Sequence, residues 1–114
     1  MKQETVINLE QQGDITIFDI KGDVTAFSEP FFKEAYQKAN AQSIRKLLLK
    51  FDEDAYINSG GIAIIISMVA EARKKNQKVG VCSLSDHFVK IFDMIVLTDY
   101  VEMYPTEEEA LKAL

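Results

Sequence analysis

The spacing of apolar residues changes several times along the chain, from the alternation typical of strands to the spacing typical of helices. Segments 5–9 and 15–20 alternate or run apolar with β-branched residues, and a polar turn at 11–14 lies between them. They predict two adjacent strands near the N-terminus. Further short apolar runs, each bounded by polar residues, predict strands at 46–51, 78–82 and 101–104.

Helical spacing occupies the intervals between these runs. Ser28 and Pro30 mark the beginning of a first helix, with the serine as its cap, and apolar residues follow at 31, 32, 35, 36 and 39. A second helix is predicted over 62–75, with cations at its end and a core stripe at 62, 65, 66 and 69. Ser85 is expected to cap a third helix with apolar positions 88, 91, 92 and 95, and Thr106 a last one with apolar positions 110, 111 and 114.

The order of these elements predicts an α/β domain, in which about four helices cover a mixed, mostly parallel sheet of about five strands. No linker or low-complexity tract divides residues 1–114, so we expect a single domain. The chain has 114 residues, with 13 basic and 18 acidic side chains and a net charge of −5. Because the charges are interspersed and acidic on balance, nucleic acid is not an expected partner.

The composition also disfavours several kinds of site. The longest nearly apolar stretch, 62–70, is well short of the roughly 18–20 residues that span a bilayer, so no membrane span is expected. The N-terminal residues have no apolar signal core, which predicts a cytoplasmic protein. Cys82 and His87 are the only cysteine and histidine, too few for a disulfide or a Cys/His zinc site. Phosphate-binding and dinucleotide-binding glycine motifs are missing, so we expect no cofactor and no enzymatic activity.

The loop 57–61, with the sequence Ile-Asn-Ser-Gly-Gly, joins the Leu-rich strand to the most apolar helix. In α/β domains, ligands and partners tend to meet the loops at the carboxyl ends of strands. Ser59 at the beginning of a helix lies among free backbone N–H groups, where the helix dipole favours negative charge. A phosphate on Ser59 would add about −1.5 to −2 charges, and the helix N-terminus would hold it locally without unfolding the domain.

Three segments carry a resemblance: 22–26 before the first helix, 56–63 before the second, and 89–94 in the third. In their order and spacing they resemble the STAS domains, and among them the single-domain bacterial anti-sigma factor antagonists, over nearly the whole chain. The resemblance implies that Ser59 is phosphorylated by an anti-sigma factor that is also a serine kinase of the GHKL type. It further implies that only the unphosphorylated form binds this kinase and frees the sigma factor, and that a serine phosphatase resets the switch.

The resemblance and the residue pattern together nominate a set of partner-binding residues: Asp23, Thr25, Asn58, Ser59, Gly60, Gly61, Ile64 and Met68. The chain departs from the family at two of these positions, since the family usually has an aspartate at position 58 and often Ser, Thr or Ala at position 60. Asn58 keeps the hydrogen-bonding size of aspartate but removes a charge beside the acceptor hydroxyl. The two glycines allow another backbone to approach closely.

Several alternatives stay open at this point. Ser59 or Asn58 can serve simply as a helix N-cap, which contributes about 1 kcal/mol to stability. Ile64 and Met68 lie off the core stripe of their helix, so they either contact a partner, which allows a homodimer as well, or pack under a neighbouring helix. The acidic loop 52–54 is either solvated or a Mg²⁺ site. In place of the phosphorylated antagonist, the chain can be an unphosphorylated STAS scaffold subunit of a lipid-transport ATPase or a stress-sensing complex.

Overall fold

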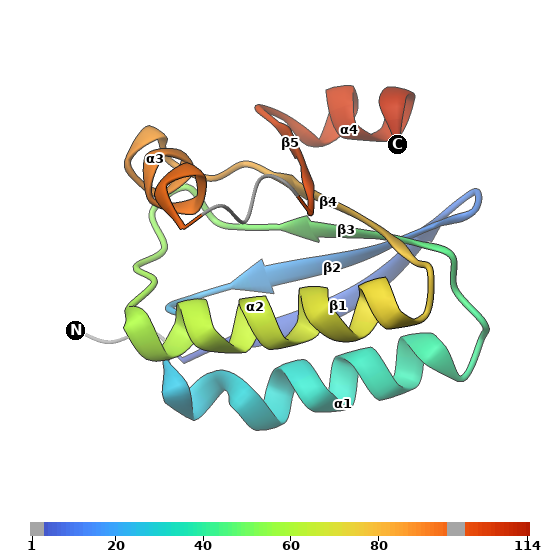
Figure 1. Ribbon diagram of the computed structural model, residues 1–114, viewed down its shortest axis with the longest axis horizontal. Coiled ribbons are helices and arrows are strands. Elements are labelled where there is room, and N and C mark those ends of the chain that lie inside the picture. The colour runs from blue at the N-terminus through green and yellow to red at the C-terminus, as the bar shows by residue number, and fades with distance from the viewer. Residues whose placement is uncertain (1–3, 96–99) are drawn as a thin grey trace.

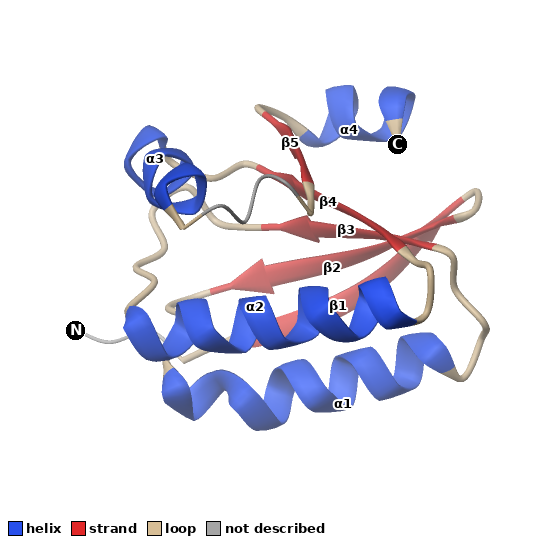
Figure 2. Ribbon diagram, in the orientation of Figure 1, coloured by secondary structure: helices blue, strands red, loops and turns tan. Residues whose placement is uncertain are grey.

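Strands and helices alternate along the chain in the predicted order (Figures 1 and 2). The computed structural model describes residues 4–95 and 100–114. Its elements are β1 (Val6–Gln12), β2 (Ile15–Lys21), the 3₁₀ helix η1 (Ala26–Ser28), α1 (Glu29–Asn40), β3 (Lys46–Lys50), α2 (Ser59–Lys74), β4 (Lys78–Cys82), α3 (Asp86–Met94), β5 (Glu102–Tyr104) and α4 (Glu107–Ala113).

The strands form one five-stranded sheet in the order β1-β2-β3-β4-β5. β1 pairs with β2 in antiparallel fashion, whereas β2, β3, β4 and β5 are parallel. The mixed, mostly parallel sheet of the sequence prediction is therefore confirmed. Because β2, β3 and β4 are parallel, the loops that follow them meet at one end of the sheet.

Helices cover both faces of the sheet. Figure 1 shows α1 and α2 side by side on one face, α3 beyond the carboxyl end of β4, and α4 on the opposite face. Side chains alternate across a strand, so Leu47 and Leu49 join the core with α1, α2 and α3, while Leu48 joins a smaller core under α4. All three leucines are fully buried, as expected for a central strand covered on both faces. Among the described residues, no helix combines the length and the apolar character that crossing a membrane requires.

The first helix begins where the sequence predicts, directly after Ser28 and with Pro30 in its first turn, but its cap differs. Ser28 precedes α1 but makes no side-chain cap bond to it. Its hydroxyl is buried and accepts a hydrogen bond from the Thr25 backbone N–H at 2.9 Å, while Thr25 caps η1 in turn. The prediction of Ser28 as cap was therefore wrong, because the serine closes the preceding 3₁₀ turn instead.

The second helix also differs from its prediction. It begins at Ser59 rather than at 62, and Ile66 in the predicted core stripe is 42% exposed. Met68, which lies off that stripe, is buried instead. The reason is tertiary: α1 packs along α2 and covers the side that carries Met68, which turns the Ile66 side toward solvent.

Candidate functional site

The loop after β2 and the loop after β3 are joined by backbone hydrogen bonds at the carboxyl end of the sheet. The Val24 N–H donates to the Tyr56 carbonyl at 2.9 Å, and the Asn58 N–H donates to the Val24 carbonyl at 3.1 Å. The Asp23 carboxylate accepts the Tyr56 N–H at 3.1 Å. These bonds hold the segment before α2 in place, so the beginning of the helix is fixed by a segment more than thirty residues away in the sequence.

Asn58 is the N-cap of α2. Its side-chain oxygen accepts the Gly61 N–H at 2.9 Å, and its carbonyl accepts the first intrahelical bond, from the Ile62 N–H. Ser59 is consequently the first helical residue, and its side chain is exposed. Of the two capping candidates left open by the sequence, the structure selects Asn58, and the hydroxyl of Ser59 takes no part in the cap.

The two glycines of the loop pack against the chain's own backbone. A Cβ on Gly61 would lie 2.2 Å from the Val24 carbonyl oxygen, and one on Gly60 would lie 2.9 Å from the Cβ of Ala26. Close approach was predicted for these glycines, and the approaching backbone belongs to residues 24–26. Gly61 is buried by this contact, and its role in partner binding stays a prediction.

Most of the predicted partner-binding residues meet at this one place. Asp23 and Thr25 come from the loop after β2, and residues 58–60 come from the beginning of α2. All of them are half-buried except Ser59, which is exposed. Together these five residues form what we call the Ser59 surface.

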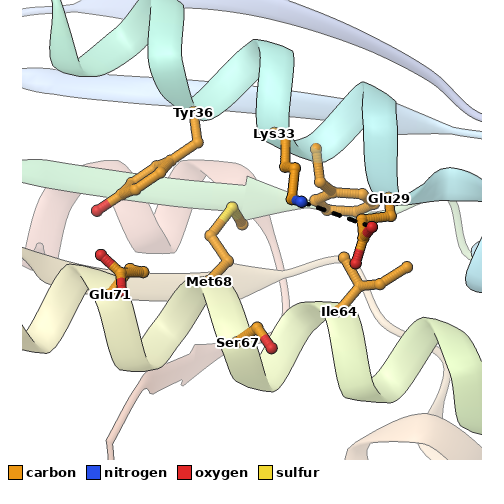
Figure 3. A pocket seen from close by; sticks show the side chains of 8 residues that line it. Glu29, Lys33, Tyr36, Ile64, Ser67, Met68 and Glu71 are labelled. Carbon is orange, nitrogen blue, oxygen red and sulfur yellow. Dashed lines mark ion pairs between the residues drawn. The ribbon is translucent and has the colours of Figure 1, made fainter.

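Ile64 and Met68 lie elsewhere, in a cavity of about 130 Å³ between α1 and α2. Figure 3 shows Met68 pointing from α2 toward α1, near Tyr36, with the Glu29–Lys33 ion pair at one end. Met68 is only 7% exposed, in agreement with the alternative that it packs under the neighbouring helix, and its role as a partner contact stays a prediction. Ile64 is half-buried in the same place.

Two exposed aromatic side chains beside the Ser59 surface were missed by the sequence analysis. Phe27 in η1 is 84% exposed, and Tyr56, two residues before the N-cap, is 59% exposed. The ring of Tyr56 meets Phe88 of α3 edge-to-face at 6.4 Å between centroids. Single aromatic residues outside a periodic pattern carry no signal in the sequence that would mark them as exposed.

The two segments that build the Ser59 surface are acidic or neutral. Segments 22–32 and 51–72, to which its residues belong, contain no Lys or Arg. Among residues 4–95 and 100–114, no three Asp, Glu, His or Cys side chains come together so as to hold a metal ion. Glu53 and Asp54 in the acidic loop are exposed, which favours its interpretation as a solvated loop.

Cys82 is buried on the strand β4, where desolvation raises the pKa of its thiol, in agreement with a packing role.

Substitution of Asn58 by alanine is expected to lower the free energy of unfolding by about 1 kcal/mol, because the Gly61 N–H loses its acceptor. Asn58→Asp should be at least as stable as the natural protein, since aspartate keeps the acceptor and its charge suits the helix N-terminus. Urea denaturation of both variants measures this difference. Equal stability of the alanine variant and the natural protein would contradict the assignment of Asn58 as the cap.

Comparisons with known proteins identify a family and relatives of this chain. The family model described as the STAS domain matches residues 6–110. Proteins named anti-sigma-B factor antagonist from Listeria monocytogenes and Listeria innocua are each 25% identical over 95 residues, which are 83% of this chain and 82% of theirs.

Solved structures show the same fold. An anti-sigma factor antagonist from Mycobacterium paratuberculosis superimposes with a TM-score of 0.80 at 18% identity, over 96% of this chain and 93% of that one. The Bacillus cell fate determinant SpoIIAA in its phosphorylated form gives a TM-score of 0.66 at 16% identity, over 94% of this chain and 97% of that one. At these identities the superpositions establish the architecture alone.

Proposed function

The chain belongs to the STAS domain family, and from that premise we propose that it is an anti-sigma factor antagonist switched by phosphorylation of Ser59. The observation that carries the proposal is the exposed position of Ser59 as first residue of α2, while Asn58 supplies the cap. A hydroxyl that is not needed for the fold is available for modification. The names of the Listeria relatives support the same role.

The modification is a phosphoryl transfer from ATP. The Ser59 Oγ forms a bond to the γ-phosphorus, the bond from that phosphorus to the ADP oxygen breaks, and the hydroxyl proton passes to a base. The carboxamide of Asn58, next to Ser59, is not basic enough to take up this proton, so we assign that base to the kinase. Following the family resemblance, we take the partner to be an anti-sigma factor that is also a serine kinase of the GHKL type, acting in the cytoplasm, and we take a serine phosphatase to reverse the reaction.

Release of the partner follows from the charge of the product. A phosphate on Ser59 gains the free N–H groups of the helix N-terminus, but segments 22–32 and 51–72 supply no Lys or Arg to neutralise it. The dianion therefore stays heavily hydrated. A partner that packs over residues 58–60 would have to strip this water, and the cost of desolvation favours dissociation.

The proposal is tested by incubating the purified chain with a cognate GHKL-type serine kinase and ATP, and by measuring the mass of the intact protein. We expect a gain of one phosphoryl group in the natural chain and none in Ser59→Ala. An unchanged mass, or the same gain in Ser59→Ala, would overturn the proposal.

A second candidate is an unphosphorylated scaffold subunit of a lipid-transport ATPase or a stress-sensing complex. It is favoured by Asn58, which stands where the family usually has an aspartate. A complex that co-purifies with the chain and is indifferent to ATP would support the scaffold. Dissociation of the complex on addition of ATP would support the phosphorylation switch instead.

A further inference from the structure

Among the described residues, Phe27 is the large apolar side chain with the greatest exposed fraction, 84%. A single exposed apolar residue is common on protein surfaces and means little by itself. Two further features distinguish Phe27: the backbone turn that carries it is rigid, and it lies next to the beginning of α2.

The 3₁₀ turn that carries Phe27 is rigidly closed. The Phe27 N–H donates to the Thr25 hydroxyl at 3.2 Å, and the Ser28 N–H donates to the Thr25 carbonyl at 2.9 Å. The Ser28 hydroxyl accepts the Thr25 N–H and also contacts the buried hydroxyl of Thr5. A fixed backbone means that little conformational entropy is lost when a partner covers the ring of Phe27.

The same turn is packed directly against the beginning of α2. Ala26, the residue before Phe27, is the one whose Cβ would lie 2.9 Å from a Cβ on Gly60. Ser59 precedes Gly60, so Phe27 and Ser59 each lie one residue from this contact. On its other side, Phe27 borders a groove of about 400 Å³ that Asp23, Thr25 and Phe31 also line.

We propose that Phe27 is the anchor by which the kinase that phosphorylates Ser59 recognises this chain, with the ring inserted into an apolar socket of the kinase. The inference rests on the proposed function. A protein that covers Ser59 in a stable complex buries about 800 Å² of each partner. Phe27 is an exposed apolar side chain one residue from the Ala26–Gly60 contact, so a footprint of this size centred on that contact would include it. Within such an interface, a few residues provide most of the affinity, and aromatic side chains are enriched in its core. Phe27 acts in binding only, since it does not touch the reacting hydroxyl.

The chain contains no tryptophan, so Phe27→Trp introduces a single tryptophan at the anchor, whose emission is distinct from that of the tyrosines. We expect its emission to shift to the blue when the purified kinase of the mass experiment is added. The matched control is Tyr100→Trp: Tyr100 is a 50% exposed aromatic residue whose ring contacts the guanidinium of Arg73, and Arg73 lies in the last turn of α2. This turn is about 20 Å from Ser59 by the helix rise. The emission of Tyr100→Trp should not shift.

The second measurement is affinity. Phe27→Ala should raise the Kd for the same kinase about 30-fold or more, as expected of an interface hot spot, and should lower kcat/KM for Ser59 phosphorylation through KM with kcat largely unchanged. Tyr100→Ala should leave both constants unchanged. Because Phe27 is almost fully exposed, Phe27→Ala should unfold at the same urea concentration as the natural chain, which excludes misfolding as the cause.

The two proposals fail in different ways. The anchor proposal is wrong if Ser59 is phosphorylated normally and either the Kd of Phe27→Ala is unchanged or the emission of Phe27→Trp does not shift. The proposed function is not affected by that result. Absence of any phosphorylation or complex with the natural chain overturns the proposed function, and the anchor falls with it.

Discussion

Replacement of Gly61 by alanine is expected to lower the free energy of unfolding by about 3 kcal/mol. In an ordinary helix the same change is stabilising, by roughly 0.5–1 kcal/mol, because alanine is the better helix former. Here the new Cβ would lie 2.2 Å from the carbonyl oxygen of Val24. That carbonyl cannot simply move away, since it accepts the Asn58 N–H that fixes the beginning of α2.

Urea denaturation followed by circular dichroism measures the effect on Gly61→Ala. The matched control is Ser59→Ala in the same helical turn, where the side chain is exposed and the change should stay within about 0.5 kcal/mol. Stability of Gly61→Ala equal to or above that of the natural chain would show that the loop at 24–26 does not pack on α2 as described.

Substitution of Ser59 by aspartate is expected to weaken binding of the kinase by about 30-fold or more. A carboxylate covered by the partner without a matching cation leaves a charge buried and unpaired, which costs about 2–5 kcal/mol. The chain itself should remain folded, because a negative charge in the first turn of a helix is stabilising. The effect is therefore one on docking.

Ser59→Asn and Ser59→Ala separate charge from size in this experiment. Asparagine has the shape of aspartate without the charge, and alanine only removes the hydroxyl. Both should bind with Kd values within about tenfold of the natural chain, as measured by calorimetric titration. If aspartate and asparagine bind equally, the charge is not what releases the partner.

Much of the architecture is visible in the sequence because its signals are local. The Leu47–Leu49 run reports a strand covered on both faces, and the caps Ser85 and Thr106 both accept the backbone N–H groups that capping requires. Each of these signals depends on residues within a few positions of one another. The strands and helices they predict are the ones observed.

The beginning of α2 shows where local signals stop. Two consecutive glycines have poor helix propensity, so the pattern places the start at 62 although the helix begins at Ser59. The Asn58 cap and the packing of Val24 on Gly61 compensate for the poor helix propensity of the two glycines. The second of these contacts joins residues far apart in the sequence, and no periodicity records it.

The sequence by itself determined the alternation of strands and helices, the single mixed sheet, and the presence of a serine at the N-terminus of a helix. Only the tertiary structure decided that Gly61 and Met68 face inward, that Ser59 is left uncovered, and that Phe27 stands beside it. The physical reason is that exposure depends on which elements pack together. Helix packing and loop contacts are made between segments that the chain keeps far apart, and such contacts leave no local pattern to detect.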